Sequence, residues 1–215
     1  TDCNGRYCYL NPYVGAQIAV AEAARNIICT GGYPAAVTDC LNFGNPEKPD
    51  RFWQFKNCIM GIVDSCTKFK IPVISGNVSF YNENPKGAVY PTPTIGMIGI
   101  VENIESRCTV GFKDPGDIIV LLGKTKKEIG GTEYLKVIHN MVKGDCPSLD
   151  IEEETAVQSA CLEAITSGIV ASAHDVSDGG LIICLAESSI HSGIGAEISF
   201  KDADMRADIL LFSES

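Results

Sequence analysis

The sequence is poor in positive charge. Its 215 residues include 17 Lys and Arg against 27 Asp and Glu, which gives a formal net charge of −10. Nucleic-acid binding usually depends on clustered Lys and Arg, so this function class is not expected. A phosphate group would instead have to be held by backbone N–H groups, helix N-termini and metal ions.

Paired cysteine motifs are also missing. None of the ten cysteines forms the C-x-x-C pair that is typical of structural zinc sites. Their density lies below the roughly 8–10% of a disulfide scaffold. We therefore expect all ten thiols to be reduced and free of metal.

Long apolar runs are absent as well. An uncharged stretch around residues 88–101 is broken by Pro91 and Pro93, and no segment reaches the roughly 18 apolar residues of a membrane span. No membrane association is expected, and a cytoplasmic location is the default prediction.

The apolar residues that are present predict an α/β (α+β) fold. Helical spacing indicates helices over residues 16–27, 52–69, 132–142, 152–167 and 181–190. Apolar runs predict strands over residues 35–38, 72–75, 95–101, 118–122 and 169–173. A boundary near residue 110 divides the chain into two domains, residues 1–110 and 111–215. The first residue is not Met and residues 209–211 look like a strand just before the last residue, so we expect a chain truncated at both ends.

Two polar segments follow predicted strands, where α/β proteins bind ligands. Asp39 ends the first strand, and its carboxylate could hold a metal or a nucleotide; alternatively it organises an Asx-turn. Gly76, Asn77 and Ser79 follow the second strand and offer close backbone approach, a carbonyl oxygen for Mg²⁺ and a hydroxyl. The alternative interpretation of this segment is a tight polar turn.

A third polar segment follows the last predicted strand. Asp175 and Asp178 precede two glycines, Gly179 and Gly180, at a helix start, which is the arrangement of a metal-assisted phosphate site. Alternatively, Ser177 or Asp178 only caps the helix and His174 is only a hydrogen-bonding side chain.

Four long motifs carry a resemblance to a known family. They are T-D-C-N-G-R-Y-C-Y-L-N-P-Y at residues 1–13, T-D-C-L-N-F-G-N-P at 38–46, S-G-N-V-S-F-Y-N at 75–82 and H-D-V-S-D-G-G-L at 174–181. In this order they resemble the synthetase subunits of phosphoribosylformylglycinamidine synthases in their small bacterial form. The resemblance implies two aminoimidazole ribonucleotide synthetase-like domains, N-terminal and C-terminal, that make up most of the second half of such a subunit.

The resemblance also implies an activity. These ligases of purine biosynthesis use ATP, Mg²⁺ and glutamine-derived ammonia to convert formylglycinamide ribonucleotide into formylglycinamidine ribonucleotide. The implied partners are the first half of the synthetase, a glutaminase subunit and a small bridging subunit. Carried over to this sequence, Asp39 and Gly76 are implied to bind ATP, Asn77 to bind Mg²⁺ and Ser79 to bind the substrate.

The sequence departs from the family pattern where a catalytic base is expected. Asn4 and Arg6 stand in place of histidines, and Asn26 stands in place of a metal-binding Asp. No catalytic residue is therefore expected in this half, and the chain alone is expected to be inactive. The alternative function is a catalytically degenerate, structural half that binds an auxiliary nucleotide near Asp175, Asp178 and Gly180, with Asp2 as a further candidate. A third option is another enzyme of the same fold, such as thiamine-phosphate kinase.

Overall fold

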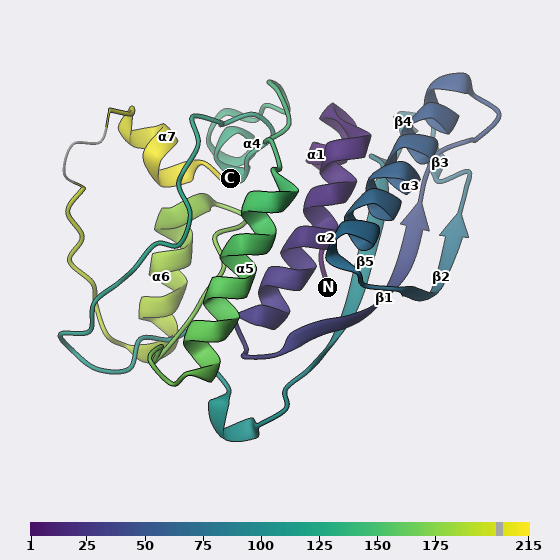
Figure 1. Cartoon of the computed structure of the whole chain (residues 1–215). Helices are drawn as coiled ribbons and strands as arrows, with labels where there is room; N and C mark the ends of the chain where they lie inside the picture. Colours follow the sequence, from purple (N-terminus) through teal and green to yellow (C-terminus); the bar gives the residue numbers. More distant parts are fainter. Residues whose placement is uncertain (201–203) are drawn as a thin grey trace.

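The computed structural model describes residues 1–200 and 204–215 (Figure 1). Its helices are α1 (Gly5–Leu10), α2 (Pro12–Ile28), α3 (Pro49–Phe69), α4 (Glu133–His139), α5 (Ile151–Thr166), α6 (Gly180–Ser192), α7 (Ala207–Phe212) and the short 3₁₀ helix η1 (Ile104–Ser106). Its strands are β1 (Tyr33–Asn42), β2 (Val73–Ser79), β3 (Glu83–Asn84), β4 (Gly87–Ala88) and β5 (Thr92–Ile100). The α/β fold class is confirmed, and the five predicted helices are present as α2, α3, α4, α5 and α6, with α4 ending at His139, before the predicted end at residue 142.

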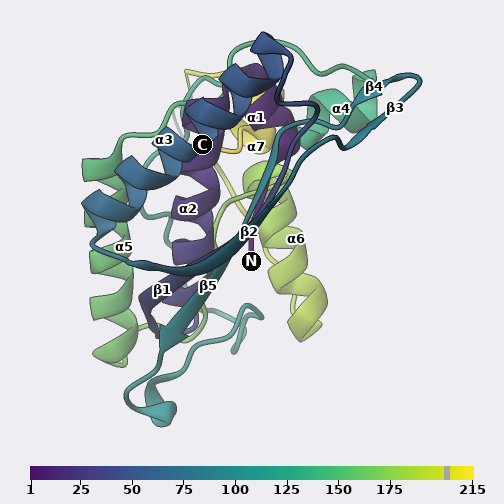
Figure 2. The same cartoon turned by 90° about the vertical axis from the view of Figure 1, so that its right-hand side faces the viewer.

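The main sheet has three strands in the order β2-β1-β5. β1 runs parallel to β2 and antiparallel to β5. Helices α2 and α3 pack on one face of this sheet (Figure 2). Their apolar side chains meet Val37, Leu41 and Ile95 of the sheet in the hydrophobic core. Among the residues described, no helix of this core lies on the other face.

Small residues let the N-terminal helices approach closely. A Cβ on Gly61 of α3 would lie 2.2 Å from the carbonyl oxygen of Tyr13, and a Cβ on Gly15 of α2 would lie 2.5 Å from the backbone nitrogen of Cys8. Both distances are far inside van der Waals contact. Glycine is therefore required at these two crossings, which fix α2 between α1 and α3.

The strands predicted in the C-terminal part are wrong. Residues 118–122 and 169–173 form no strand, and residues 209–211 belong to helix α7. Ile118 is 89% exposed and Ile169 is 80% exposed. A strand is stabilised by a neighbour that pairs with its backbone, and within residues 1–200 and 204–215 neither run has one. Helices α4 to α7 therefore occupy this part of the molecule without a sheet (Figure 1).

The predicted ends of the first two strands are also wrong. The β1–β2 ladder continues through Asp39↔Gly76 and Cys40↔Asn77 to Asn42↔Ser79. Asp39, Gly76, Asn77 and Ser79 therefore lie within strands and not in loops beyond them. β2 is an edge strand and is largely exposed.

The predicted domain boundary falls in the irregular stretch between η1 and α4. Across it, the Nε2 of Gln158 on α5 donates to the carbonyl oxygen of Ala21 on α2, at 3.3 Å. The division into residues 1–110 and 111–215 stays a prediction. Among the residues described, no helix combines the length and apolar character needed to cross a bilayer.

Candidate functional site

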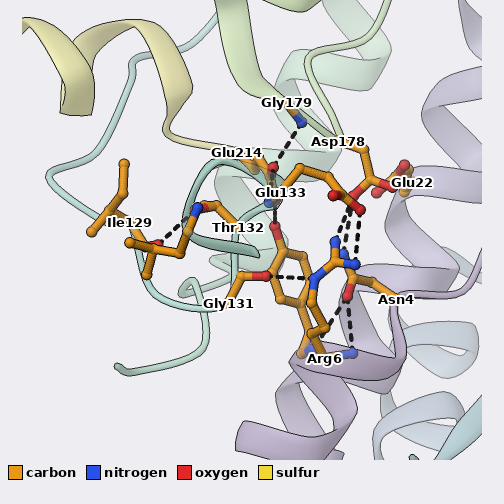
Figure 3. Close-up of polar contacts among 12 residues, drawn as sticks. Asn4, Arg6, Glu22, Ile129, Gly131, Thr132, Glu133, Asp178, Gly179 and Glu214 are labelled. Carbon is orange, nitrogen blue, oxygen red and sulfur yellow. Dashed lines mark hydrogen bonds and ion pairs between the residues drawn. The ribbon is translucent and has the colours of Figure 1, made fainter. Parts of the chain in front are cut away.

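The N-terminal segment meets the C-terminal part in a polar junction (Figure 3). Asn4 caps α1 through its Oδ1, which accepts from the backbone N–H groups of Arg6 at 3.1 Å and Tyr7 at 3.2 Å. Its Nδ2 donates to Oδ1 of Asp178 at 3.0 Å. Both ends of the Asn4 side chain are therefore occupied by structural bonds.

Arg6 connects three segments at the same junction. Its Nε donates to the carbonyl oxygen of Gly131 at 2.9 Å, and its Nη1 lies 2.8 Å from Oε1 of Glu133. Its Nη2 lies 3.6 Å from Oδ1 of Asp178. Arg6 thus fixes α1 against the start of α4 and against the loop before α6.

Two half-buried carboxyl groups, Asp2 and Glu22, lie near Asp178 at this junction. Burial, together with the nearby charge of Asp178, raises the pKa of Asp2 to about 6. Burial and the charge of Asp2 raise the pKa of Glu22 to about 9. Carboxylates that repel one another in a low-dielectric region retain protons, so this part of the junction holds a proton at neutral pH.

Asp175 lies near Glu22 as well, but its carboxyl group is ionised. Although burial acts to raise its pKa, the His174 ring and the Arg25 guanidinium hold the pKa of Asp175 below its usual value. In turn, the bond to Asp175 raises the pKa of His174 to about 11, and Nε2 of His174 lies 3.0 Å from Oε2 of Glu187. His174 is therefore a cationic hydrogen-bonding side chain, which agrees with the second interpretation of this segment.

We name Asp2, Glu22, Asp175 and Asp178 the junction carboxylates. Oδ2 of Asp2 and Oδ2 of Asp175 are buried and accept no hydrogen bond, which is a costly arrangement that a cation would relieve. In the part of the chain that the structure describes, no three His, Cys, Asp or Glu side chains already enclose a metal position. The donors fit Mg²⁺, which commonly takes one or two carboxylates and completes its shell with water and phosphate oxygens.

The predicted phosphate site at Gly179 and Gly180 is already filled by protein. Oε1 of Glu214 accepts from the backbone N–H of Gly179 at 2.7 Å and from that of Glu133 at 2.8 Å (Figure 3). A Cβ on Gly180 would lie 2.6 Å from the carbonyl oxygen of Ser213. The absence of a side chain at Gly180 therefore leaves room for the C-terminal segment. The anion at this site is the carboxylate of Glu214 and not the predicted phosphate. Neither Ser177 nor Asp178 caps α6, because its N-cap is Gly179.

Asp39 and Gly76 form a second candidate site on the sheet. A Cβ on Gly76 would lie 2.3 Å from Oδ1 of Asp39, so glycine lets the carboxylate lie across β2. Burial raises the pKa of Asp39. In β1, Asp39 lies two residues from the buried Val37 and two residues from the buried Leu41. Because residues two apart in a strand point to the same side, Asp39 lies on the face that α2 and α3 cover.

Asn77 and Ser79 lie on the opposite face of the same strand. Asn77 is exposed and pairs with the exposed Cys40, and Ser79 pairs with Asn42 at the end of the ladder. The structure therefore brings Asp39 together with Gly76, and Asn77 together with Ser79, but the sheet separates the two pairs. A ligand that uses both pairs has to reach around the edge of β2.

Sequence reasoning missed Glu22 and Glu214 and assigned no role to Glu133. Glu22 lies in the middle of a predicted helix, and only its position among alanines, A-V-A-E-A-A at residues 19–24, could have marked it as buried. Glu133 follows a recognisable cap, Thr132, whose Oγ1 accepts from the backbone N–H of Leu135 at 3.4 Å. Glu214 carried no signal, because its contacts are distant in sequence.

The raised pKa values predict how stability depends on pH. Asp2 and Glu22 bind protons more tightly in the folded chain than at their usual values of 3.8 and 4.5. Their contribution to stability is therefore complete below about pH 4 and is lost as the pH rises through about 6 and about 9. We expect Glu22→Gln to raise the free energy of unfolding at pH 9 by about 1–3 kcal/mol.

Thermal unfolding between pH 4 and pH 9 measures this effect. Glu102→Gln on the surface is the control, with an expected change within about 0.5 kcal/mol. A Glu22→Gln variant whose stability falls with pH as steeply as that of the parent chain would contradict the assignment.

Comparison with known protein families matches both parts of the chain. A model of the N-terminal domain of AIR synthase related proteins matches residues 1–101, and a model of the C-terminal domain matches residues 114–215. The phosphoribosylformylglycinamidine synthase subunit PurL of Thermoanaerobacter pseudethanolicus is 56% identical over 215 residues. The match covers 100% of this chain and 29% of that relative, so this chain spans less than a third of the relative's length.

Solved structures resemble the fold. Thermotoga maritima PurL complexed with ATP superposes with a TM-score of 0.59 at 21% identity, covering 97% of this chain and 30% of that chain. The structure of PurLQS from the same organism gives a TM-score of 0.58 at 20% identity, covering 96% of this chain and 30% of that chain. At these identities the likeness shows a shared fold.

Proposed function

Because the chain belongs to the AIR synthase related proteins, we propose that it is part of the ATP-dependent ligase that converts formylglycinamide ribonucleotide into formylglycinamidine ribonucleotide. The observation that carries this proposal is the 56% identity, over the whole chain, to a phosphoribosylformylglycinamidine synthase subunit. The rest of the synthetase, a glutaminase subunit and a small bridging subunit complete the enzyme. A cytoplasmic location belongs to the same proposal.

The proposed reaction exchanges an amide oxygen for nitrogen. The amide oxygen is a poor leaving group, so transfer of the γ-phosphoryl group of ATP to it creates a better one, and ammonia then displaces phosphate. Mg²⁺, when bound, neutralises charge on the transferring group. Water has to be kept out, because it would compete with ammonia.

We assign the contacts of this chain residue by residue. Asp39 and Gly76 are proposed to contact ATP, Asn77 to hold Mg²⁺ through its side-chain oxygen, and Ser79 to contact the substrate. The exposure of Asn77 on an edge strand supports its role, because the oxygen is free to meet a ligand. The half-buried position of Asp39 on the covered face favours a contact made at the strand edge.

The chain contributes binding and not proton transfer in this proposal. Asn4 is held by Asp178 and by the start of α1, and Arg6 is held by Gly131 and Glu133. Neither side chain accepts a proton near neutral pH. The base for the ammonia step therefore belongs outside these residues.

A second candidate function is a bracing half that binds an auxiliary nucleotide at the junction. The buried oxygens of Asp2 and Asp175 that lack hydrogen-bond donors favour it, since a nucleotide-bound cation would satisfy them. Glu214 stands against a phosphate at Gly179 and Gly180, because its carboxylate already takes the Gly179 N–H.

Substitution of Asn77 in the longer synthetase separates the two functions. We expect Asn77→Leu to lower kcat by roughly 10²-fold, because one oxygen ligand of Mg²⁺ is lost. Asn77→Asp keeps an oxygen there and should retain most of the activity. Ser75→Leu, on the same face of the same exposed strand, is the matched control and should leave kcat within about twofold. Unchanged kinetics in Asn77→Leu would favour the bracing half.

A further inference from the structure

The backbone carbonyl of Ser79 accepts two hydrogen bonds. The backbone N–H of Phe43 donates to it at 3.0 Å, and Nδ2 of the Asn82 side chain donates to it at 2.9 Å. A carbonyl oxygen has two lone pairs, so both are used. Because Ser79 is the last residue of β2, the end of this strand is held from two sides, by the segment after β1 and by the turn after β2.

Asn82 also connects the ends of the two parallel strands. Its Nδ2 donates to the carbonyl oxygen of Phe43 at 3.2 Å, and its backbone N–H donates to the same oxygen at 3.1 Å. Phe43 directly follows β1, and Asn82 lies three residues after β2. A side-chain amide has two N–H donors, so the half-buried Asn82 amide can serve one strand end with each.

The turn between Ser79 and Asn82 has a strained backbone at Tyr81. The φ angle of Tyr81 is 61°, which lies in the left-handed region that few residues other than Gly, Asn and Asp adopt. Its N–H donates to the carbonyl oxygen of Gly44 at 3.2 Å, and its side chain is exposed. Such a conformation persists only where surrounding contacts hold it. The bonds of Asn82 and the bond to Gly44 supply those contacts.

Further contacts secure this turn on the segment after β1. The Phe80 ring packs edge-on against Phe55 with ring centroids 5.0 Å apart, and Phe55 packs in the same way against Phe43 at 5.3 Å. Oε1 of Glu83 accepts from the backbone N–H of Asn45 at 2.8 Å. The two segments after β1 and β2 therefore form one unit, from which the β3–β4 hairpin projects beyond the sheet (Figure 2).

This unit fixes the place of the Ser79 hydroxyl. The Ser79 side chain is short, so the main chain and one torsion angle decide where its Oγ lies. Ser79 forms the last pair of the β1–β2 ladder, with Asn42. Beyond this pair, the bonds of Asn82 take over from the ladder in holding the two strand ends together.

We propose that Asn82 is a positioning residue for the substrate contact of Ser79. Its amide fixes the main chain at the end of β2, so that the hydroxyl meets formylglycinamide ribonucleotide in one defined place. This inference deepens the proposed function and rests on it. A displacement of about 1 Å at a reacting group can cost about 10²-fold in rate, so a residue that does not touch the substrate can have a large effect.

Kinetics of the longer synthetase test this role. Asn82→Ala removes both amide donors, and Asn82→Asp sets a carboxylate oxygen against the two carbonyl oxygens. We expect Asn82→Ala to raise the KM for formylglycinamide ribonucleotide about tenfold, and Asn82→Asp to raise it at least as much. The KM for ATP should stay within about twofold, because Asp39 and Gly76 lie three residues before the strand ends. A general loss of structure would instead raise both KM values.

A double-mutant cycle shows whether Asn82 acts through Ser79. Ser79→Ala alone should raise the KM for formylglycinamide ribonucleotide. In the Ser79→Ala background, Asn82→Ala should change this KM by less than about twofold, because two residues that act through one contact are not additive. A tenfold increase in both backgrounds would show that Asn82 acts elsewhere, and it would overturn the proposal.

Asn84→Ala is the matched control. Asn84 lies two residues further on, in the hairpin, where its Oδ1 accepts from the backbone N–H of Lys86 at 2.8 Å. This variant should leave both KM values within about twofold. Thermal unfolding shows which variants are folded. Asn82→Ser, which keeps one donor, should show a smaller increase in the same KM alone, so the proposal can be tested even if Asn82→Ala does not fold.

The outcomes distinguish this inference from the proposed function. A KM for formylglycinamide ribonucleotide in folded Asn82→Ala equal to that of the parent would overturn the positioning role alone. An unchanged KM in Ser79→Ala would instead overturn the proposed substrate contact, and the positioning role would fail with it. Equal increases in the KM values for both substrates would reduce Asn82 to a residue that only stabilises the turn.

Discussion

Replacing Glu214 with alanine is expected to lower the free energy of unfolding by about 3–5 kcal/mol. Its Oε1 accepts from the backbone N–H groups of Gly179 and Glu133, and its Oε2 accepts from the Tyr7 hydroxyl. Glu214 is 6% exposed and Tyr7 is 2% exposed. Alanine would leave three donors without an acceptor, two of them in buried bonds and one in a part-buried bond, and each buried donor costs about 1–3 kcal/mol.

Two variants show which bonds matter. Glu214→Gln keeps an oxygen for the two backbone N–H groups and offers its amide to Tyr7, so it should lose about 1 kcal/mol or less. Tyr7→Phe removes one donor together with its bond and should lose about 1 kcal/mol. Denaturant unfolding of the three variants measures the series. A Glu214→Ala variant as stable as Glu214→Gln would contradict the proposed anchoring role.

Local patterns predicted the helices well. The step of three and four residues between Phe55, Ile59, Ile62 and Cys66 identified α3, and Ile62 and Cys66 are buried as that pattern requires. Asp150 caps α5 by accepting from Glu152 and Glu153, at 2.9 and 3.1 Å. Helix periodicity and capping are local, so they are visible in a sequence without knowledge of the tertiary fold.

Strands were predicted less well, because a strand depends on a neighbour. The run at residues 118–122 has the composition of a central strand, yet Val120 is 70% exposed and unpaired in the described chain. The opposite error occurred in the N-terminal part of the chain. Composition indicated a loop at Gly76 and Asn77, but the β1–β2 ladder includes both residues. Gly76 is tolerated in the strand because the Asp39 carboxylate fills the space of its side chain.

The junction was predicted only in part. Asp2, Asp175 and Asp178 were candidates because of their neighbours in sequence, and the structure brings them together with Glu22. The bond from Asn4 to Asp178 joins residues that are 174 positions apart. Spacing along the chain carries no information on such contacts, so the carboxylates and the Glu214 anchor became visible only in the fold.

This chain by itself is expected to form no formylglycinamidine ribonucleotide from formylglycinamide ribonucleotide, ATP, Mg²⁺ and ammonia. Asn4 and Arg6 are held by structural bonds and accept no proton. His174 is the histidine nearest the junction carboxylates, and its pKa of about 11 keeps it protonated at neutral pH. Without the histidine base that Asn4 and Arg6 replace, the displacement step is expected to lose the roughly 10²–10⁴-fold contribution of general base catalysis.

The assay compares product formation by the purified chain, by the longer synthetase and by a mixture of the chain with the separately expressed first half. A cooperative thermal transition of the chain shows first that it is folded, so that lack of turnover is not lack of structure. We expect turnover with the longer synthetase and with the mixture only. Turnover by the chain alone would mean that a base lies within these residues. Asp2, whose pKa of about 6 makes it a proton acceptor at neutral pH, would be the first to test by Asp2→Asn.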